Sequence, residues 1–128
     1  MENINIPIQL EYRLTKIVNP EDTANRYGSG LLEVFATPAL VAFMEQTCHT
    51  AIQPYLPEGF SSVGTEVSIK HLKATPLGDT VKCKAILQQA EGRKLIFSVT
   101  AYDSNGLIGE GTHTRFIIDI QRFMAKLG

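Results

Sequence analysis

The sequence predicts an α+β fold in which one antiparallel five-stranded sheet wraps around a central apolar helix. Five segments show strand patterns, and short turns separate the last four of them. A further segment, between the first and the second strand, has apolar residues at helical spacing. Because a short turn joins antiparallel neighbours, these four strands are expected to form a meander. No repeat, linker or change of composition divides the chain, so we expect residues 1–128 to form a single domain.

The first strand is predicted at residues 8–17, where apolar and polar side chains alternate. Its apolar phase comprises Ile8, Leu10, Tyr12 and Leu14. Asn19-Pro20 then breaks the pattern, and polar residues with Gly28 and Gly30 continue as far as Leu31. We therefore expect a loop between this strand and the helix.

The helix is predicted to begin at Thr37-Pro38, with the threonine as N-cap and the proline at the first helical position, where no N–H is needed. Pro54 marks its end. At 100° per residue, about half of the helix circumference is apolar. This face comprises Leu40, Val41, Phe43, Met44, Thr47, Cys48, Ala51 and Ile52. So wide a face is typical of a helix enclosed by a curved sheet.

Four more strands are predicted after Gly59, separated by turns at residues 76–79, 91–92 and 103–106. The residues expected to face the helix are Val63, Thr65, Val67, Ile69 and His71 in the first, Val81, Cys83, Ala85 and Leu87 in the second, and Leu95, Phe97, Val99 and Ala101 in the third. The last strand is expected from Leu107 to about Ile120. Cys48 and Cys83 both fall in apolar patterns, so we expect two buried thiols.

The composition excludes several classes of function. Lys and Arg total 12 against 13 Asp and Glu, so the net charge of −1 lacks the basic excess of a nucleic-acid binder. The longest apolar run, residues 39–44, is far shorter than the roughly 20 residues of a membrane helix, and residues 1–7 do not resemble a secretory signal, so we expect a cytoplasmic protein with no membrane partner. No Walker, G-x-S-x-G, H-E-x-x-H or paired C-x-x-C motif occurs, and we expect neither a metal nor a redox cofactor.

Two side chains can supply acid–base chemistry near neutral pH. His71 shares the strand phase of Val67 and Ile69, so its ring is expected to point toward the helix. It is there either a general base or a hydrogen-bonded core residue. Thr37 is either the helix cap alone or a hydroxyl beside the free N–H groups of the helix start, where a substrate oxyanion can be stabilised.

Three further residues have both a functional and a structural interpretation. Glu45 lies at the border of the apolar helix face, as either a partly desolvated reactive carboxylate or a solvent-facing one. Gly64 interrupts a strand and indicates either the close approach of a ligand or a β-bulge. Arg115 shares a strand phase with Gly109 and Gly111, which leave room for a ligand, although a surface salt bridge is the alternative.

Together these patterns resemble the hot-dog fold and, within it, the fluoroacetyl-CoA thioesterase group. The resemblance runs from about residue 33 to the C-terminus and rests on Glu33-Val34-Phe35-Ala36-Thr37, Met44-Glu45, Gly64-Thr65, His71 with Ala74-Thr75-Pro76, Glu91-Gly92-Arg93 and Gly111-Thr112-His113-Thr114-Arg115. It implies a catalytic set of Thr37, Glu45 and His71, with Gly64 and Arg115 at the substrate or coenzyme A. Residues 28–32 lack the bulky aromatics with which the fluoroacyl-specific pattern covers the acyl pocket, so the acyl group stays undefined.

The resemblance implies a homodimer, or a dimer of dimers, that hydrolyses a small acyl-CoA. Coenzyme A would be part of the substrate, and the chemistry is undemanding because a thiolate with a pKa of about 8.5 leaves readily. One alternative is a hot-dog acyl-CoA hydratase or dehydratase, which releases no free thiol. Another is a non-catalytic acyl-CoA-binding module in which His71 and Glu45 are structural. Whether Thr37 or water attacks the thioester stays open.

Overall fold

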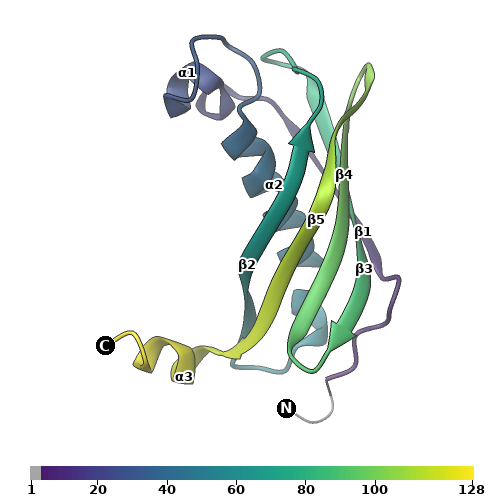
Figure 1. Ribbon diagram of the computed structural model, residues 1–128, viewed down its shortest axis with the longest axis vertical. Helices are drawn as coiled ribbons and strands as arrows, with labels where there is room; N and C mark the ends of the chain where they lie inside the picture. The colour runs from purple at the N-terminus through teal and green to yellow at the C-terminus, as the bar shows by residue number, and fades with distance from the viewer. Residues whose placement is uncertain (1–3) are drawn as a thin grey trace.

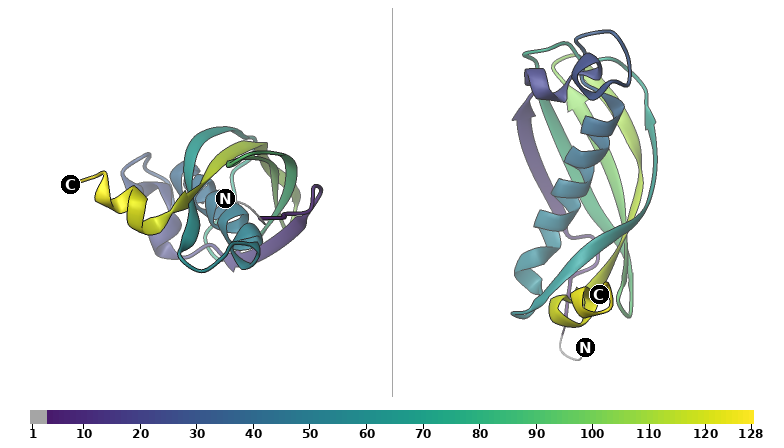
Figure 2. Two further views of the ribbon diagram at one scale, coloured as in Figure 1. Left: turned by 90° about the horizontal axis from the view of Figure 1, so that it is seen from below. Right: turned by 90° about the vertical axis from the view of Figure 1, so that its left-hand side faces the viewer.

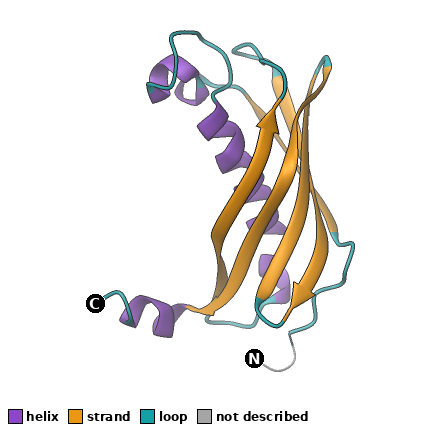
Figure 3. Cartoon of the chain, viewed as in Figure 1, coloured by secondary structure: helices purple, strands orange, loops and turns teal. Residues whose placement is uncertain are grey.

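The computed structural model describes residues 4–128 and contains one five-stranded antiparallel sheet (Figure 1, Figure 3). Its strands are β1 (Glu11–Ile17), β2 (Phe60–His71), β3 (Thr80–Glu91), β4 (Lys94–Asp103) and β5 (Gly106–Asp119), in the order β1-β3-β4-β5-β2. The sheet curls around the long helix α2 (Thr37–Ile52), as the view from below in Figure 2 shows. The predicted fold class is confirmed.

The core fills the space between α2 and the concave face of the sheet. The inward residues predicted on β3 and β4 are all buried, namely Val81, Cys83, Ala85, Leu87, Leu95, Phe97, Val99 and Ala101. The predicted apolar face of α2 is buried too, except for Val41, which is half-buried. Cys48 and Cys83 are free buried thiols, as predicted, and burial raises the pKa of Cys83 to about 11. Both thiols are therefore protonated at neutral pH.

The helix begins where the sequence predicts, but the predicted N-cap is wrong. Ala36 takes the N-cap position with an extended backbone, and no side chain of residues 4–128 caps the helix. Thr37 is the first helical residue and Pro38 the second, so the proline still lies in the first turn, where its missing N–H is not needed. The Thr37 hydroxyl is consequently free to find a partner elsewhere in the fold.

A β-bulge in β2 reverses the predicted direction of several side chains. The register against β5 shifts between Gly64 and Glu66. A bulge inserts one residue and so exchanges the two faces of a strand. Val63, predicted to face inward, pairs with the exposed Phe116, whereas Ser62 contacts the buried Arg115. Beyond the bulge, the inward direction predicted for His71 is correct.

Short helices occur where the sequence predicts only irregular structure. η1 (Pro20–Asp22) and α1 (Ala24–Tyr27) lie within the expected loop, η2 (Gln53–Tyr55) follows α2, and α3 (Ile120–Ala125) follows β5. Each is too short for apolar periodicity to reveal it. β1 starts at Glu11 rather than at residue 8, which leaves Ile8 51% exposed. Within residues 4–128, no helix is long and apolar enough to cross a membrane.

Candidate active site

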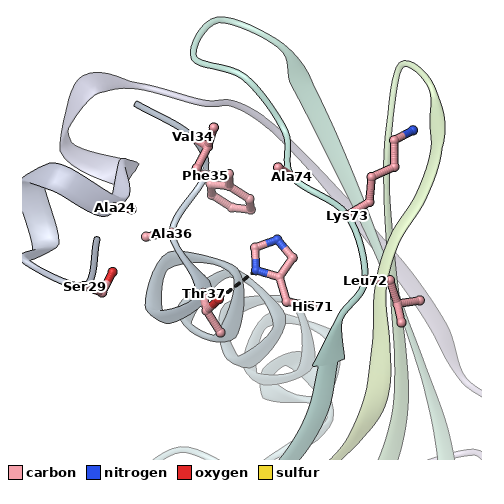
Figure 4. Close-up of a pocket in the computed structure, with 10 residues that line it drawn as sticks. All are labelled: Ala24, Ser29, Val34, Phe35, Ala36, Thr37, His71, Leu72, Lys73 and Ala74. Atoms are coloured by element: carbon pink, nitrogen blue, oxygen red, sulfur yellow. Dashed lines mark hydrogen bonds between the residues drawn. The ribbon is translucent and has the colours of Figure 1, made fainter. Parts of the chain in front are cut away.

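The start of α2 meets the end of β2 in a threonine–histidine pair. Thr37 Oγ1 lies 2.8 Å from His71 Nδ1, as the dashed line in Figure 4 shows. The hydroxyl is on the first residue of α2 and the imidazole is on the last residue of β2. The two side chains therefore converge where the helix begins and the strand ends. The hydrogen bond joins two of the residues that the sequence singles out, although they are 34 positions apart.

His71 has a free ring nitrogen, a lowered pKa and a cavity beside it. Its second ring nitrogen, Nε2, is buried without a hydrogen-bond partner among the described residues. Burial lowers the pKa of His71 below its ordinary value of 6.5, which keeps the ring neutral at physiological pH. The ring borders a cavity of about 420 Å³ that Phe35, Thr37, Leu72 and Ala74 also line (Figure 4). A neutral imidazole with one unsatisfied nitrogen at a cavity is suited to general base catalysis.

The chain before Thr37 is held firmly from two sides. Phe35 N–H donates to the carbonyl oxygen of Thr75 at 2.8 Å, and Ala36 N–H donates to that of Asp22, also at 2.8 Å. The Asp22 carboxylate is in turn 2.8 Å from Lys16 Nζ. These contacts fix the start of α2 against the loop that carries α1, so the Thr37 hydroxyl is presented to His71 by an ordered backbone.

Glu45 belongs to a second polar cluster further along α2. Its Oε2 lies 2.9 Å from the point where a Cβ on Gly64 would stand, and His113 Cε1 and Arg115 Nη1 lie 3.0 and 3.4 Å from the same point. The missing side chain at Gly64 therefore leaves the space into which these three side chains converge. The structure brings together Glu45, Gly64 and Arg115, as it does Thr37 and His71, but within residues 4–128 no hydrogen bond or ion pair joins the two groups.

Sequence reasoning missed two members of the second cluster, Ser62 and His113. Arg115 donates from Nε to Ser62 Oγ at 2.8 Å and from Nη2 to the Ser62 carbonyl at 2.9 Å. Its Nη1 lies 3.1 Å from His113 Nε2. The available signal for His113 was its position two residues before Arg115 on the same face of β5. Ser62 gave no signal, because the bulge that turns it inward is not visible in the sequence.

Substitution of Gly64 tests the role of this cluster directly. We expect Gly64→Ala to lower kcat/KM for the acyl-CoA that the resemblance implies about ten- to a hundredfold while the protein stays folded, because the new methyl group must displace Glu45 or His113 from its position. Gly30→Ala is the matched control, since a Cβ there meets only Ala24 Cβ, at 3.4 Å. Steady-state kinetics and a thermal melt are the measurements, and an unchanged kcat/KM would contradict the assignment.

The clusters offer no metal site of the usual kind. Among residues 4–128, no group of three His, Cys, Asp or Glu side chains is arranged to hold a metal ion. The predicted residues bring to the two clusters a hydroxyl, an imidazole, a carboxylate and a guanidinium. This combination fits the chemistry of an activated carbonyl compound.

Comparison with known proteins agrees with this chemistry. A family model described as fluoroacetyl-CoA-specific thioesterase matches residues 18–121, beginning earlier than the resemblance from about residue 33. The fluoroacetyl-CoA thioesterase of Streptantibioticus cattleyicolor is 45% identical over 95 residues, which cover 74% of this chain and 68% of that protein.

Solved structures show the same fold. A threonine-to-serine variant of the fluoroacetyl-CoA thioesterase FlK, solved in complex with acetyl-CoA, superposes with a TM-score of 0.91 at 36% identity, covering 95% of this chain and 96% of the other. A hot-dog-like protein from Thermanaerovibrio acidaminovorans gives a TM-score of 0.87 at 27% identity, covering 94% and 90%. The chain therefore belongs to the fluoroacetyl-CoA-specific thioesterase family and is a thioester hydrolase with the hot-dog fold.

Proposed function

We propose that the protein hydrolyses a small acyl-CoA and that Thr37, His71 and Glu45 carry out the chemistry. The observation that carries the proposal is the 2.8 Å contact between Thr37 Oγ1 and His71 Nδ1 at a cavity, with His71 Nε2 unpartnered among the described residues. The acetyl-CoA complex of the FlK variant supports an acyl-CoA as the substrate class.

In the proposed reaction, neutral His71 removes a proton from Thr37 or from a water molecule in the same cavity. The oxygen so activated attacks the thioester carbonyl, and the free N–H groups of the first turn of α2 stabilise the oxyanion. Collapse of this intermediate breaks the C–S bond and expels the coenzyme A thiolate, which is a good leaving group because its pKa is about 8.5 and which takes up the proton held by His71. If water is the attacking group, the free acid is released at once. If Thr37 is the attacking group, an acyl-threonine ester remains, and a water molecule activated by His71 hydrolyses it in a second step. Glu45 orients the attacking group or stabilises developing positive charge.

The pH dependence follows from the state of His71. The base is active when neutral, and burial lowers its pKa below 6.5, so kcat/KM is expected to stay level near neutral pH and to fall only at a midpoint below 6.5. A pH–rate profile with a substrate at low concentration measures this midpoint. A midpoint above 6.5 would contradict a desolvated, neutral base.

We further propose that the protein works as a homodimer paired through β2. β2 ends the strand order, so one of its edges has no partner within the described chain, and an unpaired edge is a template for another strand. Val67, in the middle of this strand, is 37% exposed. α3 extends from the sheet on the side of β2 (Figure 1, Figure 2) and carries exposed Ile120 and Met124. A second copy of the chain would cover all of these apolar side chains.

Such a dimer would unite the two polar clusters. Thr37 and Glu45 are eight residues apart on α2, which corresponds to roughly 12 Å along the helix axis. In an antiparallel pair of β2 strands, the half that contains Gly64 would lie beside the half that contains the partner's His71. Glu45 and Arg115 of one chain would then serve the same substrate as Thr37 and His71 of the other.

Arg115 is proposed to contact the acyl-CoA. We expect Arg115→Ala to raise KM for the substrate about tenfold or more, because a buried charged hydrogen bond to the ligand would be lost. Lys94→Ala, on the exposed end of β4, is a control for the loss of one positive charge. If both KM and kcat of Arg115→Ala equal those of the parent protein, Arg115 does not contact the substrate.

The overall proposal is tested by a thiol-release screen over acyl-CoA esters of increasing length, including acetyl-CoA and fluoroacetyl-CoA. Free coenzyme A should appear with the short esters and decline as the chain lengthens. Substrate consumption without free thiol would instead identify a hydratase, and tight binding without turnover would identify a binding module. Leu31 and Leu32 are 92% and 67% exposed in place of bulky aromatics, so fluoroacetyl-CoA should have no advantage over acetyl-CoA.

A further inference from the structure

His113 is a fully buried histidine whose two ring nitrogens are both engaged. It lies on β5 and is 1% exposed. Nδ1 lies 2.8 Å from the carbonyl oxygen of Glu66, and Nε2 lies 3.1 Å from Arg115 Nη1. A carbonyl oxygen only accepts and a guanidinium nitrogen only donates. Nδ1 must therefore carry the proton and Nε2 must present a lone pair, so the two contacts together require the neutral Nδ1–H tautomer.

Arg115 is held by uncharged acceptors alone. Besides the imidazole of His113, it uses the hydroxyl and the carbonyl of Ser62. Within residues 4–128 it forms no ion pair with a carboxylate. These contacts engage three of the five N–H donors of the guanidinium and leave two for a further acceptor. Arg115 is thus fixed in place by neutral groups, and the Glu45 carboxylate, which faces the same space at Gly64, acts on its charge without forming an ion pair with it.

We propose that His113 is a positioning residue that, as the neutral Nδ1–H tautomer, holds Arg115 so that its charge is available to the acyl-CoA. This inference rests on the proposed function, in which Arg115 contacts the substrate. A carboxylate at this position would fix Arg115 equally well but would neutralise it. A protonated His113 would place its Nε2–H against the Nη1–H of Arg115 and would repel the guanidinium. A neutral imidazole satisfies both requirements.

The surroundings of His113 favour the form that the proposal needs. Burial lowers its pKa below 6.5 and Arg115 acts in the same direction, while the Glu66 carbonyl and Glu45 act against them. Glu66 is the first paired residue after the bulge in β2, so the acceptor that fixes the tautomer is part of the main chain of the sheet. Its position does not depend on a side-chain rotamer.

A double-mutant cycle in the full-length protein tests whether His113 acts through Arg115. His113→Ala, Arg115→Ala and the double variant are compared by KM and kcat for the best ester of the thiol-release screen. We expect His113→Ala to raise KM several-fold to tenfold, and the double variant to be no worse than Arg115→Ala. If the increase in KM of the double variant equals the product of the increases in the two single variants, His113 acts independently of Arg115. That result would overturn the inference while leaving the proposed substrate contact intact. A silent Arg115→Ala variant would remove that contact and the inference with it.

A conservative variant and a spectroscopic measurement keep the test valid if His113→Ala unfolds. His113→Gln retains an acceptor and a donor, so its KM should lie close to that of the parent protein. Thr112 is exposed on the opposite face of β5, and Thr112→Ala should leave KM unchanged. Nitrogen-15 shifts of the His113 ring should show a protonated Nδ1 and an unprotonated Nε2 at neutral pH. The other tautomer, or an imidazolium ring, would overturn the inference.

Discussion

Replacing His71 by alanine is expected to lower kcat for thioester hydrolysis by about 10²–10⁴-fold, the usual contribution of a positioned general base. The variant keeps Thr37 but removes the imidazole, 2.8 Å away, that is proposed to take a proton from Thr37 or from water. Because His71 is half-buried at the end of a strand, the fold should survive the change. Single-turnover and steady-state rates, with a thermal melt for each protein, measure the two effects separately.

His49→Ala is a suitable control for this experiment. His49 is also half-buried and burial also lowers its pKa, but it lies three turns beyond Thr37 on α2. Its removal therefore tests the loss of a histidine without the loss of the pair. A His71→Ala protein that keeps more than a tenth of kcat would show that another group is the base.

Mixing Thr37→Ala and Glu45→Gln subunits is expected to restore activity that neither variant has alone. If the dimer proposed here forms, a mixed dimer combines the intact Thr37–His71 pair of one chain with the intact Glu45 of the other, giving one complete site of two. Random exchange makes half of the dimers mixed, so about a quarter of the parental activity should return. The measurement is thiol release after the subunits are exchanged by mild denaturation and refolding.

The matched control for this mixture is Thr37→Ala with His71→Ala. Thr37 and His71 contact each other within one chain, so no mixed dimer can assemble a complete site from these two variants. Recovery in the first mixture alone would support a site that two chains share. No recovery in either mixture, with exchange verified by mass spectrometry of tagged chains, would place Glu45 in the same site as Thr37 of its own chain. A fully active monomer by light scattering would exclude the dimer requirement.

Only part of the candidate site can be predicted from the sequence. Strand alternation directed His71 toward the helix correctly, because no irregularity separates it from Val67 and Ile69. The same alternation failed for Val63, since one bulge exchanges the faces of a strand. Thr37 is recognised by its place before a proline, and of the two roles that this place suggests, the N-cap is wrong because Ala36 occupies that position. Its partner lies 34 residues away.

Local sequence patterns are enough to predict the α+β class, the meander, the buried face of α2 and most of the candidate side chains, although not Ser62 and His113. These depend on local periodicity and turn chemistry, which are properties of neighbouring residues. The pairing of Thr37 with His71, and the convergence of Glu45, His113 and Arg115 on the space beside Gly64, become visible only in the folded chain. The physical reason is that such contacts depend on the register of strands and on bulges, where a shift of one residue redirects a side chain to the other face.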